Sequence, residues 1–273
     1  MEDKPLKPFL KWPGGKFRLI DRIRATFGRG NRLIEPFTGS AAVFLNTEFE
    51  HYILADSNPD LIQLFVQLAD EGDDFIHYCR SFFMPANNTP DRYYALREEF
   101  NRSEDSRGKS ALFLYLNRHC YNGLCRYNSR GEFNTPFGRY SRPYFPEKEM
   151  RRFIHAAGRA EFLHATFADS MKLGRAGDIV YCDPPYAPLS TTAYFTDYHS
   201  GGFKWEDQQL LAQTAAELAG RGARVVISNH DTKQVRDLYR QAGARLKRFQ
   251  VRRNISCNAN KRGKVGELLA VFG

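Results

Sequence analysis

The four residues Asp183, Pro184, Pro185 and Tyr186 are the part of the sequence best suited to chemistry. They directly follow a short apolar run, residues 179–182, which the pattern predicts to be a buried strand. Proline fixes its own φ and keeps the preceding residue out of the helical region, so Asp183 and Pro184 are expected to be extended. The Asp183 carboxylate and the Pro184 carbonyl then form two acceptors in a fixed relation, and the Tyr186 ring adds a stacking plane.

Two acceptors beside a flat ring predict a binding site for a planar base that carries an amino group. Such an amine is a poor nucleophile because its lone pair is delocalised into the ring. Accepting hydrogen bonds from both of its N–H groups favours a localised lone pair that can attack an electrophile supplied by a cosubstrate. Removing one preorganised group at such a site typically lowers the rate by about a hundred- to a thousandfold. A simple proline-rich turn after a strand is the alternative.

Residues 35–40, EPFTGS, follow another predicted strand and contain Gly39, which allows a ligand to approach the backbone closely. About twenty residues after this loop opens, Asp56 ends the predicted strand 51–57, where a carboxylate can accept hydrogen bonds from ribose hydroxyls. The loop motif is weak because Ala41 stands where a G-x-G loop has its second glycine. An ordinary βαβ turn with a helix cap remains the alternative.

Residues 9–16, FLKWPGGK, place Trp12 and Lys16 on either side of the pair Gly14–Gly15. A phosphate-binding P-loop is excluded because Phe17 stands where that motif needs Ser or Thr, and because the G-x-x-x-x-G spacing is missing. A lysine and a tryptophan beside two glycines suit a ligand with a carboxylate and an adenine or sulfonium end. A structural turn with Trp12 in the core is equally compatible.

The alternation of strand and helix patterns predicts an α/β fold with a mainly parallel sheet and ligand sites at strand carboxyl ends. The predicted strands are 31–37, 51–57, 162–165, 178–182, 224–229 and 266–273. The predicted helices are 39–49, 61–71, 92–101, 109–117, 205–220 and 232–242. Helical and aromatic segments interrupt the alternation between 59 and 146, so we expect a catalytic domain formed by 1–58 and 147–273 with an insert at 59–146.

The insert has the composition of a nucleic-acid reader. Residues 117–144 contain five arginines and one acid, Glu132, with aromatic residues between them. Arginine suits phosphates and guanine edges, asparagine suits adenine edges, and an aromatic tip can fill the gap left by an extruded base. A second basic segment, 245–264, has eight Lys or Arg and no acid, and predicts phosphate contact or a solvated loop with an edge strand.

The composition sets the class of partner. The 273 residues carry a net charge of +9, which favours a polyanionic partner. Five cysteines without a CxxC pair predict reduced thiols, and the seven histidines show no ligand spacing, so we expect no metal. The first residues lack an apolar signal region, and we expect a soluble cytoplasmic protein.

The segments FLKWPGGK, EPFTGS, Asp56 and DPPY, in this order, resemble the S-adenosylmethionine-dependent amino-methyltransferases of the α group. The match extends to FLYLNRHCYNGLCRYNSRGEFNTPFGRYSRPYFP, YCDPPYAPLS and ISNHDT, so nearly the whole chain resembles the Dam-type DNA adenine-N6 methyltransferases. The resemblance implies a Rossmann-like sheet with an inserted, mainly helical target-recognition domain. It also implies that the adenine of GATC in duplex DNA is flipped and methylated, giving N6-methyladenine and S-adenosylhomocysteine.

The resemblance also implies roles for single residues. The catalytic group is Asp183, Pro184 and Tyr186. The residues expected to bind S-adenosylmethionine are Trp12, Lys16, Phe37, Gly39, Asp56, Asp169 and Asp183. The residues expected to bind DNA are Lys11, Tyr121, Asn122, Leu124, Arg126, Asn134, Pro136, Arg139 and Tyr140, with Tyr121 and Asn122 near the vacated stack.

Two other functions remain open at this stage. The same chemistry would serve the exocyclic amine of cytosine or a base in RNA. A degenerate methyltransferase would bind DNA without turnover, although the intact DPPY segment and Asp56 argue against this. We expect a monomer without an obligate protein partner in a bacterial or phage-like setting.

Overall fold

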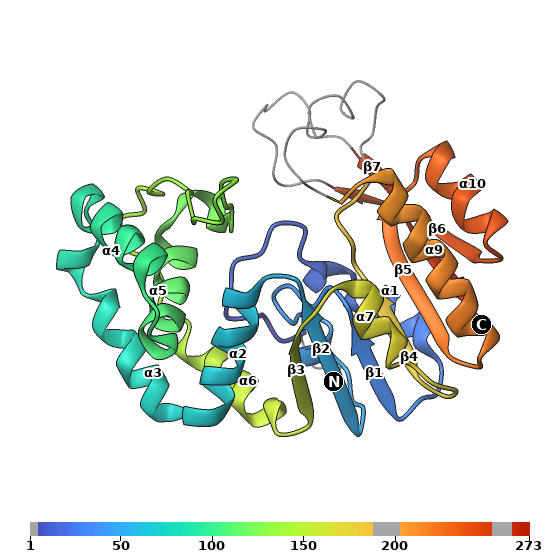
Figure 1. The fold of residues 1–273 in the computed structure, drawn as a ribbon, viewed down its shortest axis with the longest axis horizontal. Coiled ribbons are helices and arrows are strands. Elements are labelled where there is room, and N and C mark those ends of the chain that lie inside the picture. Colours follow the sequence, from blue (N-terminus) through green and yellow to red (C-terminus); the bar gives the residue numbers. More distant parts are fainter. Residues whose placement is uncertain (1–4, 188–202, 253–263) are drawn as a thin grey trace. The chain divides into compact units, whose positions relative to one another are not determined.

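The computed structural model describes residues 5–187, 203–252 and 264–273 (Figure 1). Its strands form one seven-stranded sheet in the order β3-β2-β1-β4-β5-β7-β6. Their bounds are β1 Arg32–Glu35, β2 His51–Asp56, β3 Ala160–His164, β4 Ile179–Cys182, β5 Arg224–His230, β6 Arg245–Arg252 and β7 Lys264–Phe272. β4 is parallel to β1 and β5, whereas β7 is antiparallel to β5 and β6. The predicted α/β class and its Rossmann-like sheet are confirmed.

The described helices follow the predicted ones closely in the insert and in the C-terminal half. Their bounds are α1 Ile20–Phe27, α2 Pro59–Glu71, α3 Asp73–Arg80, α4 Pro90–Arg102, α5 Ser106–His119, α6 Glu147–Ala157, α7 Phe167–Lys172, α9 Trp205–Gly220 and α10 Lys233–Gln241. Short 3-10 turns cover Lys16–Leu19, Phe44–Asn46, Ser81–Phe83, Pro85–Asn87 and Tyr121–Gly123. The sequence pattern did not predict α1, α3, α6 and α7, which have only 6 to 11 residues.

The predicted helix at 39–49 is wrong. This segment forms turns and the 3-10 turn Phe44–Asn46, and Thr47 then returns to an extended conformation. Ala41 has a φ of +59°, which a right-handed helix does not allow. The alanine thus adopts the backbone conformation that a second glycine of a G-x-G loop would supply.

Two compact units divide the described chain. The first contains residues up to 21, 38–48 and 54–164, and the second contains 22–37, 49–53 and 165–273. In the first unit, α5 is the central helix, since it packs against α2, α3 and α4 and every side chain from Ser110 to His119 is buried. A cluster of Phe9, Phe65 and Phe153 fills the core nearby, with ring centroids 4.9 to 5.8 Å apart.

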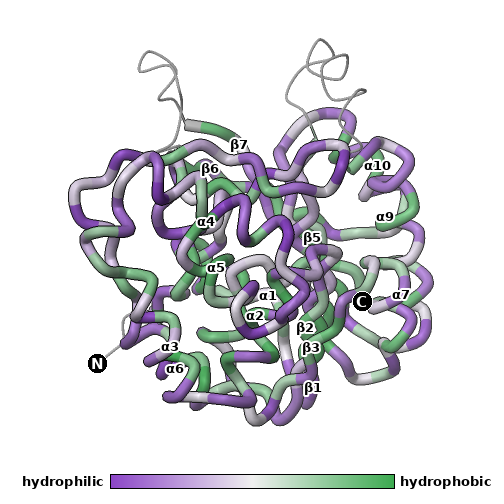
Figure 2. Tube along the Cα trace, turned by 60° about the vertical axis from the view of Figure 1, so that its left-hand side comes forward, coloured by the Kyte–Doolittle hydropathy of each residue, from purple (hydrophilic) through white to green (hydrophobic). Residues whose placement is uncertain are grey.

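In the second unit, helices pack against the strands on one side of β4 in the sheet order. α9 packs against β5 and β7, and α10 packs against β6. Figure 2 shows the difference in hydropathy along the chain, with β2 mainly hydrophobic and α10 mainly hydrophilic. α10 buries only Val235 and Tyr239 among its nine residues. Thr232 caps its first turn by accepting a hydrogen bond from the Val235 N–H at 3.3 Å.

Candidate functional site

Asp183 leaves the sheet in the second unit, at the point where the strand order reverses. β1 and β4 run parallel with Leu33 opposite Ile179, so the residues that follow both strands leave from the same edge. Asp183 directly follows β4, and Phe37 lies two residues beyond β1. Ligands of open α/β sheets bind at such a reversal. The predicted catalytic carboxylate therefore lies at the edge where a ligand crevice is expected.

The strand that leads to Asp183 is fixed by buried contacts. All four residues of β4 are buried, and Cys182 pairs in register with Ile227 of β5. The hydroxyls of Tyr181 and Ser228 are hydrogen-bonded at 2.7 Å. Burial, followed by the Asp183 carboxylate, raises the pKa of Tyr181 well above its ordinary value, so this phenol stays neutral.

The loop after Asp183 is held by three side chains. The Pro185 carbonyl accepts a hydrogen bond from the Gln208 amide at 2.9 Å. The Ala187 N–H donates to Asn229 Oδ1 at 3.1 Å, and the Ala187 carbonyl lies 2.8 Å from Nδ1 of His230. The backbone on both sides of Tyr186 is thus anchored to α9 and β5.

Tyr186 has a defined position in the same loop. Its hydroxyl donates to Glu267 Oε2 at 3.4 Å, and its ring meets the His230 ring edge-on with centroids 4.7 Å apart. Burial, followed by the Asp183 carboxylate, raises the pKa of Tyr186 well above its ordinary value. The ring is therefore a neutral, oriented plane two residues beyond Pro184.

Phe37 belongs to an aromatic cluster of the second unit. Its ring stacks on Phe167 at 5.5 Å with an interplanar angle of 20°. Phe203 meets both rings at a steep angle, with centroids 5.6 and 5.5 Å away. These three rings offer an apolar surface beside the carboxyl end of β1.

Asp169 is exposed and interacts with its own short helix. Its carboxylate accepts hydrogen bonds from Lys172 Nζ at 2.8 Å and from the Thr166 hydroxyl at 2.7 Å. The Lys172 bond, followed by the Thr166 bond, lowers the pKa of Asp169. Both oxygens are thus engaged at the N-terminal turn of α7, and a ligand would share them.

Trp12, Gly39 and Asp56 come together in the first unit. A Cβ at Gly39 would lie 2.7 Å from Trp12 Nε1, so the indole packs directly against the bare glycine, whose φ is +47°. The Gly39 N–H donates to Asp56 Oδ2 at 3.0 Å, and the Asn58 N–H donates to Oδ1 at 3.0 Å. Burial raises the pKa of Asp56, and these N–H groups oppose the shift.

Lys16 lies in the same N-terminal segment. It is buried, with 7% of its surface exposed, and its Nζ donates to the Gly14 carbonyl at 2.6 Å. Gly14 has a φ of +76°, and the Gly15 N–H closes the turn by donating to the Trp12 carbonyl at 3.1 Å. The glycine pair therefore forms a tight turn that directs the lysine back onto it.

Among the predicted DNA-binding residues, Lys11 and Tyr140 are in contact. Lys11 Nζ lies 3.8 Å from the centroid of the Tyr140 ring and donates to the Arg118 carbonyl at 3.1 Å. Burial, followed by the Arg118 charge, lowers the pKa of Lys11. The buried Asn117 side chain accepts from the Lys11 N–H at 2.9 Å and donates to the Lys11 carbonyl at 2.7 Å. Two hydrogen bonds thus hold this backbone to α5.

Tyr121 and Asn122 form the exposed turn that follows α5. The Asn122 N–H donates to the Tyr140 hydroxyl at 3.0 Å, and the Tyr121 N–H donates to the Pro136 carbonyl at 2.9 Å. Asn122 has a φ of +53°, and the Tyr121 side chain is 46% exposed. A Cβ at the next residue, Gly123, would overlap the Lys11 Cβ, so only glycine fits.

Arg126 and Asn134 form a second pair. Arg126 Nε donates to Asn134 Oδ1 at 2.7 Å, and its Nη2 donates to the Asn134 carbonyl at 3.1 Å. Arg139 is exposed with a φ of +54°, whereas Leu124 is partly buried. The arginine of the pair is exposed, and its direction is set by the asparagine.

One of the five arginines counted as candidate DNA contacts is structural. Arg118 is 9% exposed, and it donates to the carbonyls of Tyr144 at 3.0 Å and Phe9 at 3.4 Å. Its guanidinium therefore holds two backbone segments of the first unit. The spacing of basic residues could not reveal this, because the helix that carries Arg118 is buried on all sides.

Sequence reasoning missed several positioning residues. Asn117, Gln208, Asn229 and Tyr239 are buried polar side chains that bind each other or the backbone. A signal existed for Gln208, which occupies a buried position on a helix whose other buried residues are Leu or Ala. Thr232 caps α10, and the carboxylate of Asp231 pairs with Arg236 and Arg248.

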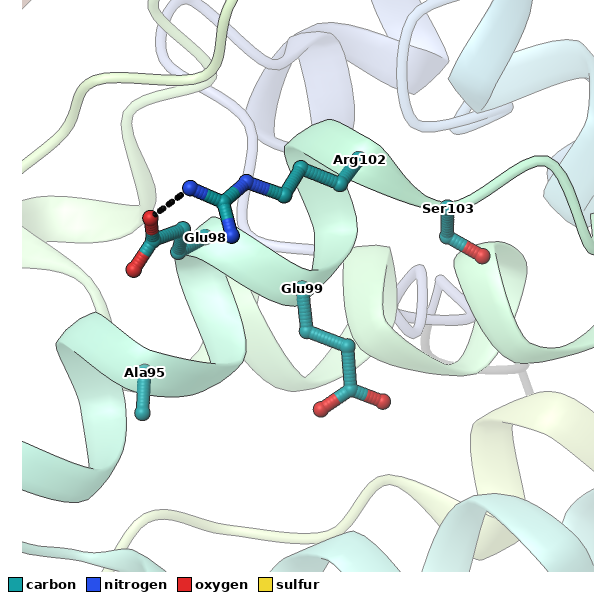
Figure 3. Close-up of a pocket in the computed structure, with 5 residues that line it drawn as sticks. All are labelled: Ala95, Glu98, Glu99, Arg102 and Ser103. Carbon is teal, nitrogen blue, oxygen red and sulfur yellow. Dashed lines mark ion pairs between the residues drawn. The ribbon is translucent and has the colours of Figure 1, made fainter.

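A surface hollow on α4 is lined by other residues than those predicted to form the site. It is lined by Ala95, Glu98, Glu99, Arg102 and Ser103 of α4 and the residue that follows it, and Glu98 pairs with Arg102 (Figure 3). Two glutamates against one arginine do not favour a phosphate or a nucleic acid. None of the predicted site residues lines it.

Two features are absent from the described residues. None of their helices is both long and apolar enough to cross a membrane. Within the same ranges, His, Cys, Asp and Glu side chains do not gather in groups of three that could hold a metal ion. Cys257, Lys261 and the 188–190 end of the YCDPPYAPLS segment lie outside these ranges.

Comparisons with known proteins agree with this geometry. Residues 12–255 match the family model "D12 class N6 adenine-specific DNA methyltransferase". The chain is 51% identical over 270 residues to a DNA adenine methylase of Serratia marcescens, covering 98% of this chain and 99% of that protein. It is 50% identical over 269 residues to the DNA adenine methylase of Escherichia coli K12, covering 98% and 96%. The counterpart from Vibrio cholerae is 48% identical over 270 residues, covering 98% and 97%. With this similarity along almost its entire length, the chain belongs to the D12 class of N6 adenine-specific DNA methyltransferases.

Proposed function

We propose that this adenine-specific DNA methyltransferase acts on GATC in duplex DNA, flips the adenine out of the stack and yields N6-methyladenine and S-adenosylhomocysteine. The observation that carries the proposal is the position of Asp183 and Pro184. They leave β4 at the reversal of the sheet order, in a loop whose next carbonyl and amide are anchored by buried side chains.

The catalytic step uses few groups. We assign the two N–H bonds of the adenine amine to the Asp183 carboxylate and the Pro184 carbonyl. The ring of Tyr186 stacks on the flipped base. S-adenosylmethionine supplies the methyl group as an electrophile on its sulfonium. The amine nitrogen would form the new N–C bond as the bond between that methyl group and the sulfonium sulfur breaks, with its electron pair left on the sulfur of S-adenosylhomocysteine. The nitrogen would then lose one proton, which the Asp183 carboxylate would accept and pass to solvent.

The residues of the first unit suit S-adenosylmethionine. Gly39 presents a bare backbone against Trp12, and a Cβ there would collide with the indole. Asp56 ends the mostly buried strand β2, and backbone N–H groups orient both of its oxygens. We assign Asp56 to the ribose hydroxyls, Lys16 to the ligand carboxylate and Trp12 to the sulfonium end. Phe37 and Asp169 are assigned to its adenine.

We further propose that residues 59–146 form the target-recognition insert. Exposed Tyr121 and Asn122 would occupy the vacated stack. The proposed base and backbone contacts are Lys11, Leu124, Arg126, Asn134, Pro136, Arg139 and Tyr140. The enzyme would act as a monomer in the cytoplasm and without a metal.

The test uses purified protein, tritiated S-adenosylmethionine and three duplexes that contain GATC, GTTC or hemimethylated GATC. Label recovered as N6-methyladenine in the first and third duplex only would support chemistry and specificity together. Label in all three would discard the GATC assignment and the reader residues. Tight binding without label would indicate a DNA-binding protein that has lost catalysis.

A further inference from the structure

Three buried polar side chains of the second unit form a closed hydrogen-bonded group next to the DPPY loop. Gln208 is 2% exposed, and Asn229 and Tyr239 are fully buried. They come from α9, β5 and α10, which are separate in sequence. Burying polar side chains is unfavourable unless their hydrogen bonds are made, so the partners of each group decide what the cluster does.

The Asn229 amide makes four hydrogen bonds. Its Oδ1 accepts from the Ala187 N–H at 3.1 Å and from the His230 N–H at 2.8 Å. Its Nδ2 donates to Gln208 Oε1 and to the Tyr239 hydroxyl, both at 3.0 Å. A rotated amide would direct an NH2 group at two N–H donors, so the network permits one orientation.

The orientation of the Gln208 amide is fixed in the same way, and this amide holds the Pro185 carbonyl. Its Oε1 accepts from Asn229 and from the Tyr239 hydroxyl at 3.2 Å, which leaves its NH2 group to donate to the Pro185 carbonyl at 2.9 Å. Tyr239 therefore accepts from one amide and donates to the other, and it sets the direction of both.

The two anchored backbone groups, the Pro185 carbonyl and the Ala187 N–H, lie on either side of Tyr186 and close to Pro184. The φ angles of Pro184 and Pro185 are fixed by their rings, so the remaining backbone freedom lies in their ψ angles. The bond to the Pro185 carbonyl fixes the peptide plane between Pro185 and Tyr186, and the bond from the Ala187 N–H fixes the plane after Tyr186. The direction of the Pro184 carbonyl thus depends on contacts made one residue later.

We propose that Gln208, Asn229 and Tyr239 are positioning residues that aim the Pro184 carbonyl and the Tyr186 ring at the target base. The inference rests on the proposed roles of Pro184 and Tyr186. None of the three positioning residues touches the substrate, and each acts through the backbone of the loop. Their loss should lower the rate of methyl transfer while leaving the binding of both substrates intact.

The primary variant is Gln208→Met, which has nearly the same shape and cannot donate to the Pro185 carbonyl. We expect the single-turnover rate on a GATC duplex to fall on the order of ten- to a hundredfold, because small misplacement of reacting groups has effects of that size. The Kd values for duplex and for S-adenosylmethionine should stay within about twofold. Tyr239→Phe should show a smaller loss of the same kind.

Two controls on α9 separate positioning from stability. Gln213→Met makes the same exchange at an exposed position and should change neither rate nor melting temperature. Leu211→Ala removes a fully buried side chain that makes no hydrogen bond, and it should lower the melting temperature without a comparable loss of rate. The proposal would be overturned if Leu211→Ala and Gln208→Met lowered the melting temperature equally and also lowered the rate equally. An unchanged rate in Gln208→Met would overturn it too.

Hydrogen exchange supplies a readout that does not need activity. The Ala187 amide should be protected in the wild-type protein and should exchange at least about tenfold faster in Gln208→Met, whereas Leu211→Ala should leave it protected. Unchanged protection in Gln208→Met would overturn the network. A wild-type protein without methyl transfer would overturn the proposed function instead, and the exchange result would still decide whether the network orders the loop.

Discussion

At the scale of single residues, buried polar side chains of the second unit hold the loop that follows Asp183. Asp183 follows a strand that is buried throughout, and the loop after it is hydrogen-bonded through Pro185 and Ala187. A carboxylate in such a frame keeps its position when a substrate arrives. Changing its chemistry without its shape is therefore an informative substitution.

Asp183→Asn should lower the rate of methyl transfer by about a hundred- to a thousandfold, because one of the two proposed acceptors becomes partly a donor. The Kd for a GATC duplex should change little. The rate is measured in single turnover, and the Kd by fluorescence anisotropy. Asp237→Asn, on the exposed face of α10, is the matched control and should behave as wild type. Full activity in Asp183→Asn would refute the two-acceptor mechanism.

Gly39→Ala tests the contact with Trp12. The new Cβ would lie 2.7 Å from Trp12 Nε1 at a φ of +47°, so the indole must move. We expect the KM for S-adenosylmethionine to rise at least about tenfold, and stability to fall by about 1–2 kcal/mol. Gly72→Ala also places a Cβ at a positive φ, +56°, but has open space around the new Cβ. Gly72→Ala should therefore lower stability without raising the KM for S-adenosylmethionine. An equal rise in KM for both variants would contradict the proposed role of the contact between Gly39 and Trp12.

At the scale of elements, α5 is a buried helix that carries titratable side chains. His119 is 1% exposed, stacks on Tyr115 with centroids 3.9 Å apart and bonds the Tyr115 carbonyl through Nδ1. Burial lowers the pKa of His119 to about 4, and the bond to Tyr115 opposes this shift. The folded protein therefore holds a neutral imidazole down to pH values at which the unfolded chain has already taken up a proton.

His119→Gln should remove a part of the acid sensitivity. Between pH of about 6.5 and 4 the unfolded state binds more protons at this site, so its contribution to stability is full above pH 6.5 and is lost as the pH falls, by up to about 3 kcal/mol. Urea unfolding at pH 7.5 and 5 measures the difference. In the variant, stability should fall less between these values, while the exposed His51→Gln should follow wild type. Identical pH dependence in His119→Gln and wild type would show that His119 does not titrate as the burial predicts.

The elements also show how far the sequence determines the fold. α9 was predicted with its observed bounds, because its apolar pattern starts and ends clearly at Trp205 and Gly220. The segment 39–49 was also predicted to be a helix, but Ala41 has a positive φ that breaks a helix there. Gly39 also packs against Trp12, a residue far away in the sequence, and the local pattern does not reveal this contact. The motif residues were found because proline, glycine and strand ends leave local signals. The Gln208 amide binds the Pro185 carbonyl 23 residues away and the Asn229 amide 21 residues away, and no local sequence signal reveals these partners.

At the scale of the whole molecule, the net charge of +9 determines how DNA is approached. Binding should weaken steeply with salt, because each neutralised phosphate releases a counterion. Arg118 does not take part in this, since it is buried and holds backbone carbonyls. The basic segment 245–264, of which 253–263 lie outside the described residues, and the exposed arginines of the insert carry the expected contacts.

Lys261→Ala and Arg126→Ala should differ in kind. Lys261→Ala should weaken binding to all duplexes and reduce the slope of log K against log salt by about one, as expected for a phosphate contact. Arg126→Ala should instead reduce discrimination between GATC and a duplex in which the guanine of that site is replaced, by about 1–3 kcal/mol. Lys233→Ala, whose charge is paired with Asp237, is the neutral control. The same slope change in both test variants, without altered discrimination, would show that Arg126 is not a base reader.

The two hydrogen bonds between Asn117 and the Lys11 backbone hold a segment in which the proposed sites of two ligands meet. Residues 11–16 contain Lys11, which we propose to contact DNA, and Trp12 and Lys16, which we propose to bind the methyl donor, so both proposed sites share one short segment. If the first ligand to bind restricts this segment further, the second ligand loses less entropy on binding. Thermodynamic reciprocity then requires that DNA tightens the methyl donor by the same factor by which the methyl donor tightens DNA.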